Sequence, residues 1–124
     1  MIKERYCSLE VAKLLKEKGF DEPCDRFYKC DSTEIYRGYV FTNTQIGDRF
    51  YNAPTHQMAM DWLREIHSIF IEISISIDLN GKYHFSYTIL DKECKYVRRG
   101  YTDFDWNYEE AVEAALKYCL TELI

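Results

Sequence analysis

The sequence predicts an α+β domain built around an antiparallel sheet, and three observations lead to this class. From Ile69 to Ile77, five isoleucines alternate with other residues, which is the period of a strand with one covered face. A second alternating run, Tyr83 to Leu90, follows after a short loop. Segments with apolar residues at helical spacing lie on either side, near residues 55–67 and 107–123. At 124 residues the chain has the size of a single domain.

The register of the predicted hairpin follows from its apolar face. A two-residue loop at Asn80-Gly81 would set the isoleucines opposite polar residues. Because the covered face fixes the register of a strand, we predict a three-residue loop, Leu79 to Gly81, with Gly81 in the left-handed conformation. This register pairs the isoleucines with aromatic residues: Ile77 with Tyr83, Ile75 with Phe85, and Ile73 with Tyr87.

The remaining elements complete the predicted order. The run "CKYVRR" is a third strand, so residues 55–124 read helix, strand, strand, strand, helix. An N-terminal helix begins at the cap residue Ser8 and ends at Gly19. Thr55 caps the second helix, and Asn107 with Glu110 forms a capping box on the last. The expected buried stripe of the second helix is Met58, Ala59, Trp62, Leu63 and Ile66.

The section from residue 21 to 53 is rich in aromatic residues and gives weaker signals. We predict two short strands, Arg26 to Cys30 and Ile35 to Phe41, joined by a polar turn. The stretch from Thr42 to Ala53 reads as a loop. How this section packs on the rest of the domain does not follow from its pattern.

Composition limits the classes of function. The net charge of −5 disfavours a surface built to hold phosphate backbones. No run approaches the roughly 20 apolar residues of a membrane helix, and no secretory signal is evident, so we expect a cytoplasmic protein without a membrane partner. Five scattered cysteines without a C-x-x-C pair favour free thiols over disulfides or a zinc site. The surplus of eleven tyrosines, seven phenylalanines and two tryptophans favours, weakly, a binding surface.

Two resemblances add to this interpretation. The order of elements from Thr55 onward, with its alanine-bearing final helix, resembles the double-stranded-RNA-binding domain. That family grips phosphates with lysines at the start of the final helix, whereas this chain reads "NYEEAVEAA" there. The segments "YCSLEVAKLLKEKGF", "APTHQMAMDWLREIH" and "YEEAVEAALKYCL" are similar to a group of short uncharacterised proteins from phages, prophages and mobile elements of Bacteroidetes. This second resemblance implies an origin and no activity.

The helix near 55–67 carries one candidate binding surface. His56 and His67 lie 11 residues apart, close together around the helix but roughly 16 Å apart along it, so they cannot share a metal ion. With Met60 and Arg64 they form a ridge beside the apolar stripe. This ridge is either a boundary half-covered by the rest of the domain or a surface offered to a protein partner.

The only local cluster of positive charge is the basic and aromatic segment 92–101. Its candidate residues for binding nucleic acid are Lys95, Tyr96, Arg98, Arg99 and Tyr101. Basic residues also protect an exposed edge strand, and the acidic start of the final helix follows at once. Nucleic-acid binding is therefore the alternative function.

No catalytic constellation, phosphate-binding loop or metal-binding motif is evident, so we expect neither an enzyme nor a cofactor. The leading hypothesis is a small non-catalytic binding or accessory protein of a phage or mobile element. It would act through contacts with an unidentified protein partner or with further copies of itself.

Overall fold

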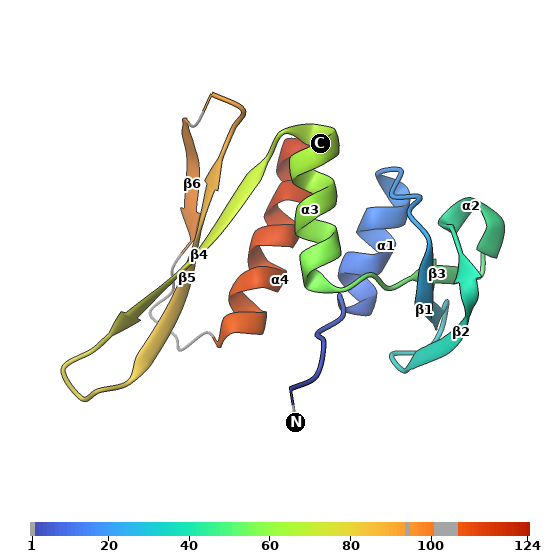
Figure 1. The fold of residues 1–124 in the computed structure, drawn as a ribbon, viewed down its shortest axis with the longest axis horizontal. Coiled ribbons are helices and arrows are strands. Elements are labelled where there is room, and N and C mark those ends of the chain that lie inside the picture. The colour runs from blue at the N-terminus through green and yellow to red at the C-terminus, as the bar shows by residue number, and fades with distance from the viewer. Residues whose placement is uncertain (1, 94, 101–106) are drawn as a thin grey trace.

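The computed structural model describes residues 2–93, 95–100 and 107–124. Within these ranges the chain forms two three-stranded antiparallel sheets, and the three long helices lie between them (Figure 1). The α+β class is confirmed, and so is the order helix, strand, strand, strand, helix that follows Thr55. None of the helices in this part of the chain has the length and apolar character needed to span a bilayer.

The N-terminal half contains α1 (Leu9–Glu17) and a sheet in the order β2-β1-β3. The strands β1 (Cys24–Lys29) and β2 (Ile35–Phe41) match the two predicted runs closely. The prediction of a loop from Thr42 to Ala53 was wrong in part, because this stretch contains α2 (Asn43–Ile46) and β3 (Phe50–Asn52). Thr42 and Gln45 form a capping box that allows even this single helical turn.

The C-terminal half contains α3 (His56–His67), the sheet β4-β5-β6 and α4 (Tyr108–Tyr118), which continues as a π-helical turn over Cys119–Leu123. The strands are β4 (Phe70–Ile77), β5 (Tyr83–Leu90) and β6 (Tyr96–Gly100). Each predicted pair across the β4–β5 hairpin is present, and Gly81 has a positive φ of 79°. The Asp78 N–H donates to the Lys82 carbonyl over 2.9 Å, which closes the three-residue loop.

The predicted helix ends are also confirmed. Ser8 and Thr55 accept hydrogen bonds from the backbone of α1 and α3, and Asn107 with Glu110 forms the capping box of α4. Phe20 folds back beyond Gly19 and is almost fully buried.

The described cysteines, Cys7, Cys24, Cys30 and Cys119, are free thiols.

One continuous core joins α1, α3 and α4 to the first part of the β4–β5 hairpin. Its buried members include Leu15, Phe20, Trp62, Leu63, Tyr87, Ile89, Leu116 and Leu120. The stripe of α3 differs from the prediction, because Met58 is 36% and Ile66 61% exposed. His56 is buried in their place. The covered face of α3 is therefore shifted around the helix, relative to the predicted stripe, toward His56.

The isoleucine face of β4 is covered over only part of its length. Ile69 is 8% exposed, and Ile71 and Ile73 are half-buried against the core. Ile75 and Ile77 are 57% and 62% exposed. The hairpin extends past the ends of the helices, and the side chains of β4 become more exposed along its outer half (Figure 1).

Candidate functional site

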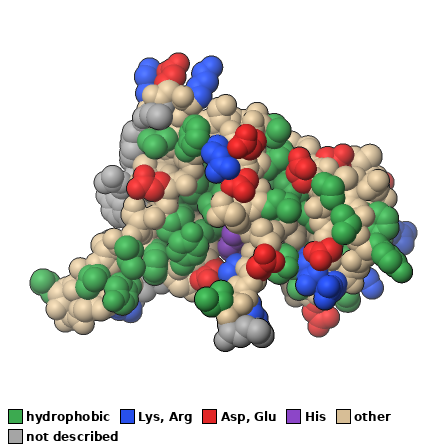
Figure 2. All heavy atoms as spheres, viewed as in Figure 1, with side chains coloured by type: hydrophobic (Ala, Val, Ile, Leu, Met, Phe, Trp, Pro, Cys, Tyr) green, Lys and Arg blue, Asp and Glu red, His purple; other side chains and the backbone are tan. Residues whose placement is uncertain are grey.

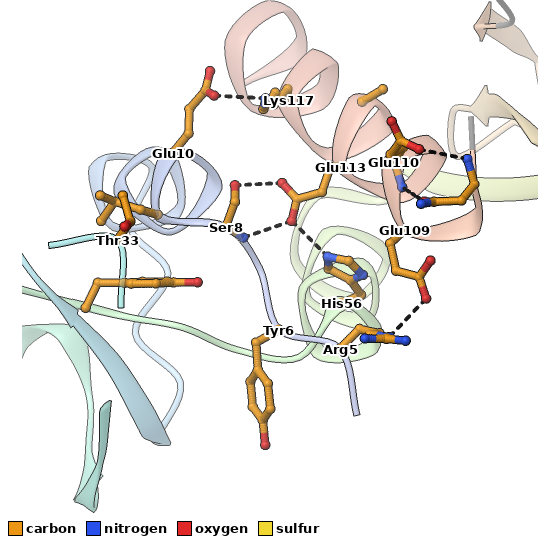
Figure 3. Close-up of a pocket in the computed structure, with 14 residues that line it drawn as sticks. Arg5, Tyr6, Ser8, Glu10, Thr33, His56, Glu109, Glu110, Glu113 and Lys117 are labelled. Carbon is orange, nitrogen blue, oxygen red and sulfur yellow. Dashed lines mark hydrogen bonds and ion pairs between the residues drawn. The ribbon is translucent and has the colours of Figure 1, made fainter. Parts of the chain in front are cut away.

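A partly buried carboxylate joins three segments that are far apart in the sequence. Glu113 of α4 accepts hydrogen bonds on Oε1 from the Ser8 N–H and from His56 Nε2, both over 2.8 Å. Its Oε2 accepts a third bond from Ser8 Oγ over 2.7 Å. Figure 3 shows the three side chains pointing toward one another. We call Ser8, His56 and Glu113 the polar junction.

Local structure places each member of the polar junction. Ser8 is the cap of α1, and its Oγ also accepts from the Val11 N–H over 3.2 Å. His56 is the first residue of α3, and its N–H donates to the Arg5 carbonyl over 2.9 Å. The N-terminal segment is thus tied to the start of α3 before it reaches Glu113. The polar junction therefore fixes α1, α3 and α4 relative to one another.

The electrostatics of the polar junction favour an ionised carboxylate. Burial raises the pKa of the Glu113 carboxyl, but the hydrogen bonds from His56 and Ser8 outweigh burial, so the pKa lies below its ordinary value. A carboxylate can only accept, so His56 Nε2 carries the proton in this contact. His56 Nδ1 is then buried without a hydrogen-bond partner among the described residues. Burying Nδ1 without a partner destabilises the folded chain, and the hydrogen bonds of the polar junction offset that loss of free energy.

Cys7 lies next to the polar junction and raises the question of metal binding or nucleophilic catalysis. Its Sγ, a nitrogen of His56 and an oxygen of Glu113 lie within 4.8 Å of one another, and these are donor types that zinc binds. An ion placed between them would have to displace hydrogen bonds that already satisfy Glu113. The thiol is fully buried, and burial followed by the charge of Glu113 raises its pKa well above the ordinary value. Reactive cysteines show the opposite shift, so the raised pKa does not favour Cys7 as a nucleophile.

An open groove of about 920 Å³ runs beside the polar junction. Two ion pairs link the segments that line it: Arg5 with Glu109 over 3.0 Å, and Lys117 with Glu10 over 2.8 Å (Figure 3). Tyr28 lines the groove and donates its hydroxyl to the Cys7 carbonyl over 2.7 Å. These contacts brace the N-terminal segment against α4.

The structure divides the predicted ridge on α3. His56 is 6% exposed and belongs to the polar junction, so it is not available on the surface. His67 lies at the other end of the helix, with its ring edge-on to Trp62 at 4.7 Å between centroids. Met60 and Arg64 line a hollow of about 220 Å³ beside the start of β4. The other residues lining it are Gln57, Phe70, Ile71, Ile73 and Tyr108.

The predicted nucleic-acid residues lie in or next to β6. The exposed Lys95 pairs with Glu93 over 3.3 Å. The Arg98 guanidinium lies 4.5 Å from the centre of the Tyr118 ring, and its Nε donates to the Tyr87 hydroxyl over 3.5 Å. Tyr96 and Arg99 belong to β6, and Tyr101 falls outside the described residues. Nucleic-acid binding by this segment stays a prediction.

The outer half of the β4–β5 hairpin forms the most exposed apolar surface on the second sheet. We call residues 75–83 the hairpin arm. Its exposed apolar side chains are Ile75 at 57%, Ile77 at 62%, Leu79 at 106% and Tyr83 at 57%. Figure 2 shows hydrophobic side chains gathered along this arm, at the lower left of the view. Contiguous apolar surface of this kind marks interaction sites in folded proteins.

Comparison of the chain with protein-family models, with curated proteins and with solved structures finds no match. The sequence resemblances described above therefore stay predictions.

Sequence reasoning missed the polar junction for a specific reason. The sequence around Ser8 signals only a helix cap, and Glu113 lies in the acidic start of the final helix. The one available signal was the position of Glu113, directly after the buried Val112 and therefore at the edge of the apolar stripe. A carboxylate at such an edge has to find donors, but its partners, Ser8 and His56, lie 105 and 57 residues away.

Proposed function

We propose that this chain is a small non-catalytic binding protein that contacts a protein partner through the hairpin arm. The observation that carries the proposal is the continuation of the isoleucine face of β4 beyond the helices that cover it, which leaves Ile75 and Ile77 more than half exposed. Exposing such side chains gives up about 1.5–3 kcal/mol for each one that could be fully buried. A partner that covers the hairpin arm recovers that free energy.

The arrangement of the polar junction supports a non-catalytic role. The carboxylate of Glu113 is bonded on both oxygens, and the neighbouring Cys7 thiol is buried with a raised pKa. Groups held in this way stabilise the packing of α1, α3 and α4. Origin in a phage or mobile element is part of the proposal through the sequence resemblance alone.

Site-specific photocrosslinking tests the proposal. A benzophenone amino acid replaces Leu79, at the tip of the hairpin arm, in cells that carry the gene. The matched control replaces Tyr39, an aromatic residue of the other sheet that is 84% exposed. We expect protein adducts from position 79 that Ile77→Lys removes, and few from position 39. Equal adducts from both positions, or none from position 79, would contradict the proposal.

A further inference from the structure

We infer that the partner of the hairpin arm is a second copy of this chain, paired edge to edge through β4 about a two-fold axis. The inference rests on the proposed function, because it uses the same exposed surface. Its first support is the order of the sheet, β4-β5-β6, which leaves β4 at an edge. Among the described residues β4 is paired on one side only, with β5.

The two edges of this sheet are built differently. β6, at one edge, carries Arg98 and Arg99, and its pairing with β5 is interrupted by a bulge next to Leu90. Charges and bulges are the devices by which proteins prevent an edge strand from pairing with another chain. β4, at the other edge, pairs with β5 without any interruption and has Glu72 as its single charged residue. One edge is protected and the other is left open to pairing.

The backbone groups at the open edge belong to the isoleucines. The Asp78 N–H donates to the Lys82 carbonyl and so points toward β5. Successive residues in an antiparallel pair alternate between facing the partner strand and facing away from it. The N–H and carbonyl groups of Ile71, Ile73, Ile75 and Ile77 therefore point to the outer edge.

The sequence of β4 is complementary to itself when two copies run antiparallel with Ser74 opposite Ser74. Ile73 then faces the partner's Ile75, and Ile71 faces the partner's Ile77. Glu72 faces the partner's Ser76, so the two carboxylates lie four residues apart along the strands. A register centred on Glu72 would set like charges directly opposite, which destabilises a pair of strands. A register centred on Ile73 would make the two Glu72 side chains diagonal neighbours across the strands, which also brings like charges close together.

The hollow beside β4 lies where this register needs space. Directly opposite residues share a face, so the partner's Ile75 and Ile77 come to lie beside Ile73 and Ile71. Those two isoleucines line the 220 Å³ hollow with Met60 of α3 and Tyr108 of α4. Each copy thus offers an uncovered pair of isoleucines and a half-covered pair beside helices. The two-fold axis places the uncovered pair of each copy against the half-covered pair of the other copy. The same contact therefore occurs twice, as an isologous interface requires.

The resulting sheet has six strands in the order β6-β5-β4-β4-β5-β6. Both of its outer edges are then the arginine-bearing β6 strands, so the assembly closes at two copies. The edge strand β2 of the other sheet also carries exposed apolar residues, Tyr39, Val40 and Phe41, and it supplies the control position for this inference.

Sedimentation velocity on the purified full chain tests the number of copies. We expect twice the monomer mass for the natural chain and for Val40→Lys, a matched change at the edge of the other sheet. Ile75→Lys should give the monomer mass with an unchanged circular dichroism spectrum, since Ile75 is 57% exposed. A monomeric natural chain, or a dimer that Val40→Lys dissociates and Ile75→Lys does not, would overturn the inference.

Oxidative crosslinking tests the register. In a background with Cys30 and Cys94 changed to serine, Ser74→Cys should form a disulfide-linked dimer on mild oxidation, because opposite residues in such a pair lie within disulfide reach. Ser76→Cys is the control, since the two copies of that residue would be offset by four positions, about 14 Å. Linkage at position 76 and not at 74 would contradict the register. If the chain is a monomer and position 79 still crosslinks to a different protein, the inference of a second copy as the partner is overturned. The proposed function would then still stand.

Discussion

His56 Nε2 lies 2.8 Å from Glu113 Oε1, and this contact joins the start of α3 to the middle of α4 inside the protein. Because Ser8 donates two further hydrogen bonds to the same carboxylate, one side chain holds three segments together. The side chain of Glu113 is 18% and that of His56 8% exposed, so little solvent screens the contact.

Removal of this carboxylate should be costly. Glu113→Ala would leave the buried His56 donor and the partly buried Ser8 donors without an acceptor, so we expect a loss of about 3 kcal/mol in the free energy of unfolding. Glu10→Ala is the control, because it removes a more exposed carboxylate that pairs with Lys117 at the surface. That change should cost less than about 1 kcal/mol. Urea unfolding of both variants measures the difference, and equal losses would contradict the role of the polar junction.

The same carboxylate predicts how stability depends on pH. The pKa of Glu113 is lower in the folded chain than its ordinary value of 4.5. A carboxyl with a depressed folded pKa contributes stability that is present above the unfolded pKa and is lost as the pH falls through the folded pKa. The natural chain should therefore lose more stability than Glu113→Gln between pH 5 and pH 3, roughly. Unfolding midpoints at several pH values test this, and parallel curves would count against it.

The thiols should differ in reactivity according to burial. Burial raises the pKa of Cys24 and Cys119 to about 12 and that of Cys7 well above its ordinary value, so few thiolates form there at pH 8, roughly. Cys30 is partly exposed. In a Cys94→Ser background we expect Ellman's reagent to modify Cys30 rapidly and the other three thiols only on unfolding. Rapid modification of Cys7 in the folded chain would contradict its assignment as a structural residue.

Two isoleucines of the same face test where the core ends. Ile69→Ala should destabilise the chain by about 2–4 kcal/mol, because the side chain is buried. Ile77→Ala should cost less than about 1 kcal/mol, because its side chain is 62% exposed. Both changes belong in the Ile75→Lys background, so that self-association does not contribute. Comparable losses at the two positions would show that the hairpin arm is covered within a single copy.

Local signals in the sequence predicted much of the fold. Ser8, Thr55 and Asn107 cap their helices because a short polar side chain can satisfy the free N–H groups of the first turn, which depends on near neighbours alone. The register of the β4–β5 hairpin followed from the parity of its isoleucines and aromatic residues. The strand β3 and the single-turn helix α2 were missed, because three or four residues give too short a pattern to recognise.

Features that depend on distant partners could not be predicted in the same way. The period of β4 identifies its apolar face, but the exposure of Ile75 and Ile77 depends on how far α3 and α4 extend along the sheet. The position of His56 at the edge of a stripe was clear, but its burial depends on Glu113, which lies 57 residues away. Helical spacing alone places His56 on one ridge with Met60 and Arg64. Tertiary packing separates them, because His56 is buried while Met60 and Arg64 line a hollow.

Amide hydrogen exchange along β4, read by nuclear magnetic resonance, tests the pairing of this edge most directly. The Ser74 N–H points toward β5 and should exchange slowly in every form of the chain. The Ile73 and Ile75 N–H groups point to the outer edge. We predict that they exchange slowly in the natural chain and many times faster in Ile77→Lys, where Ser74 stays protected. Fast exchange at Ile73 and Ile75 in the natural chain, with Ser74 protected, would contradict the account.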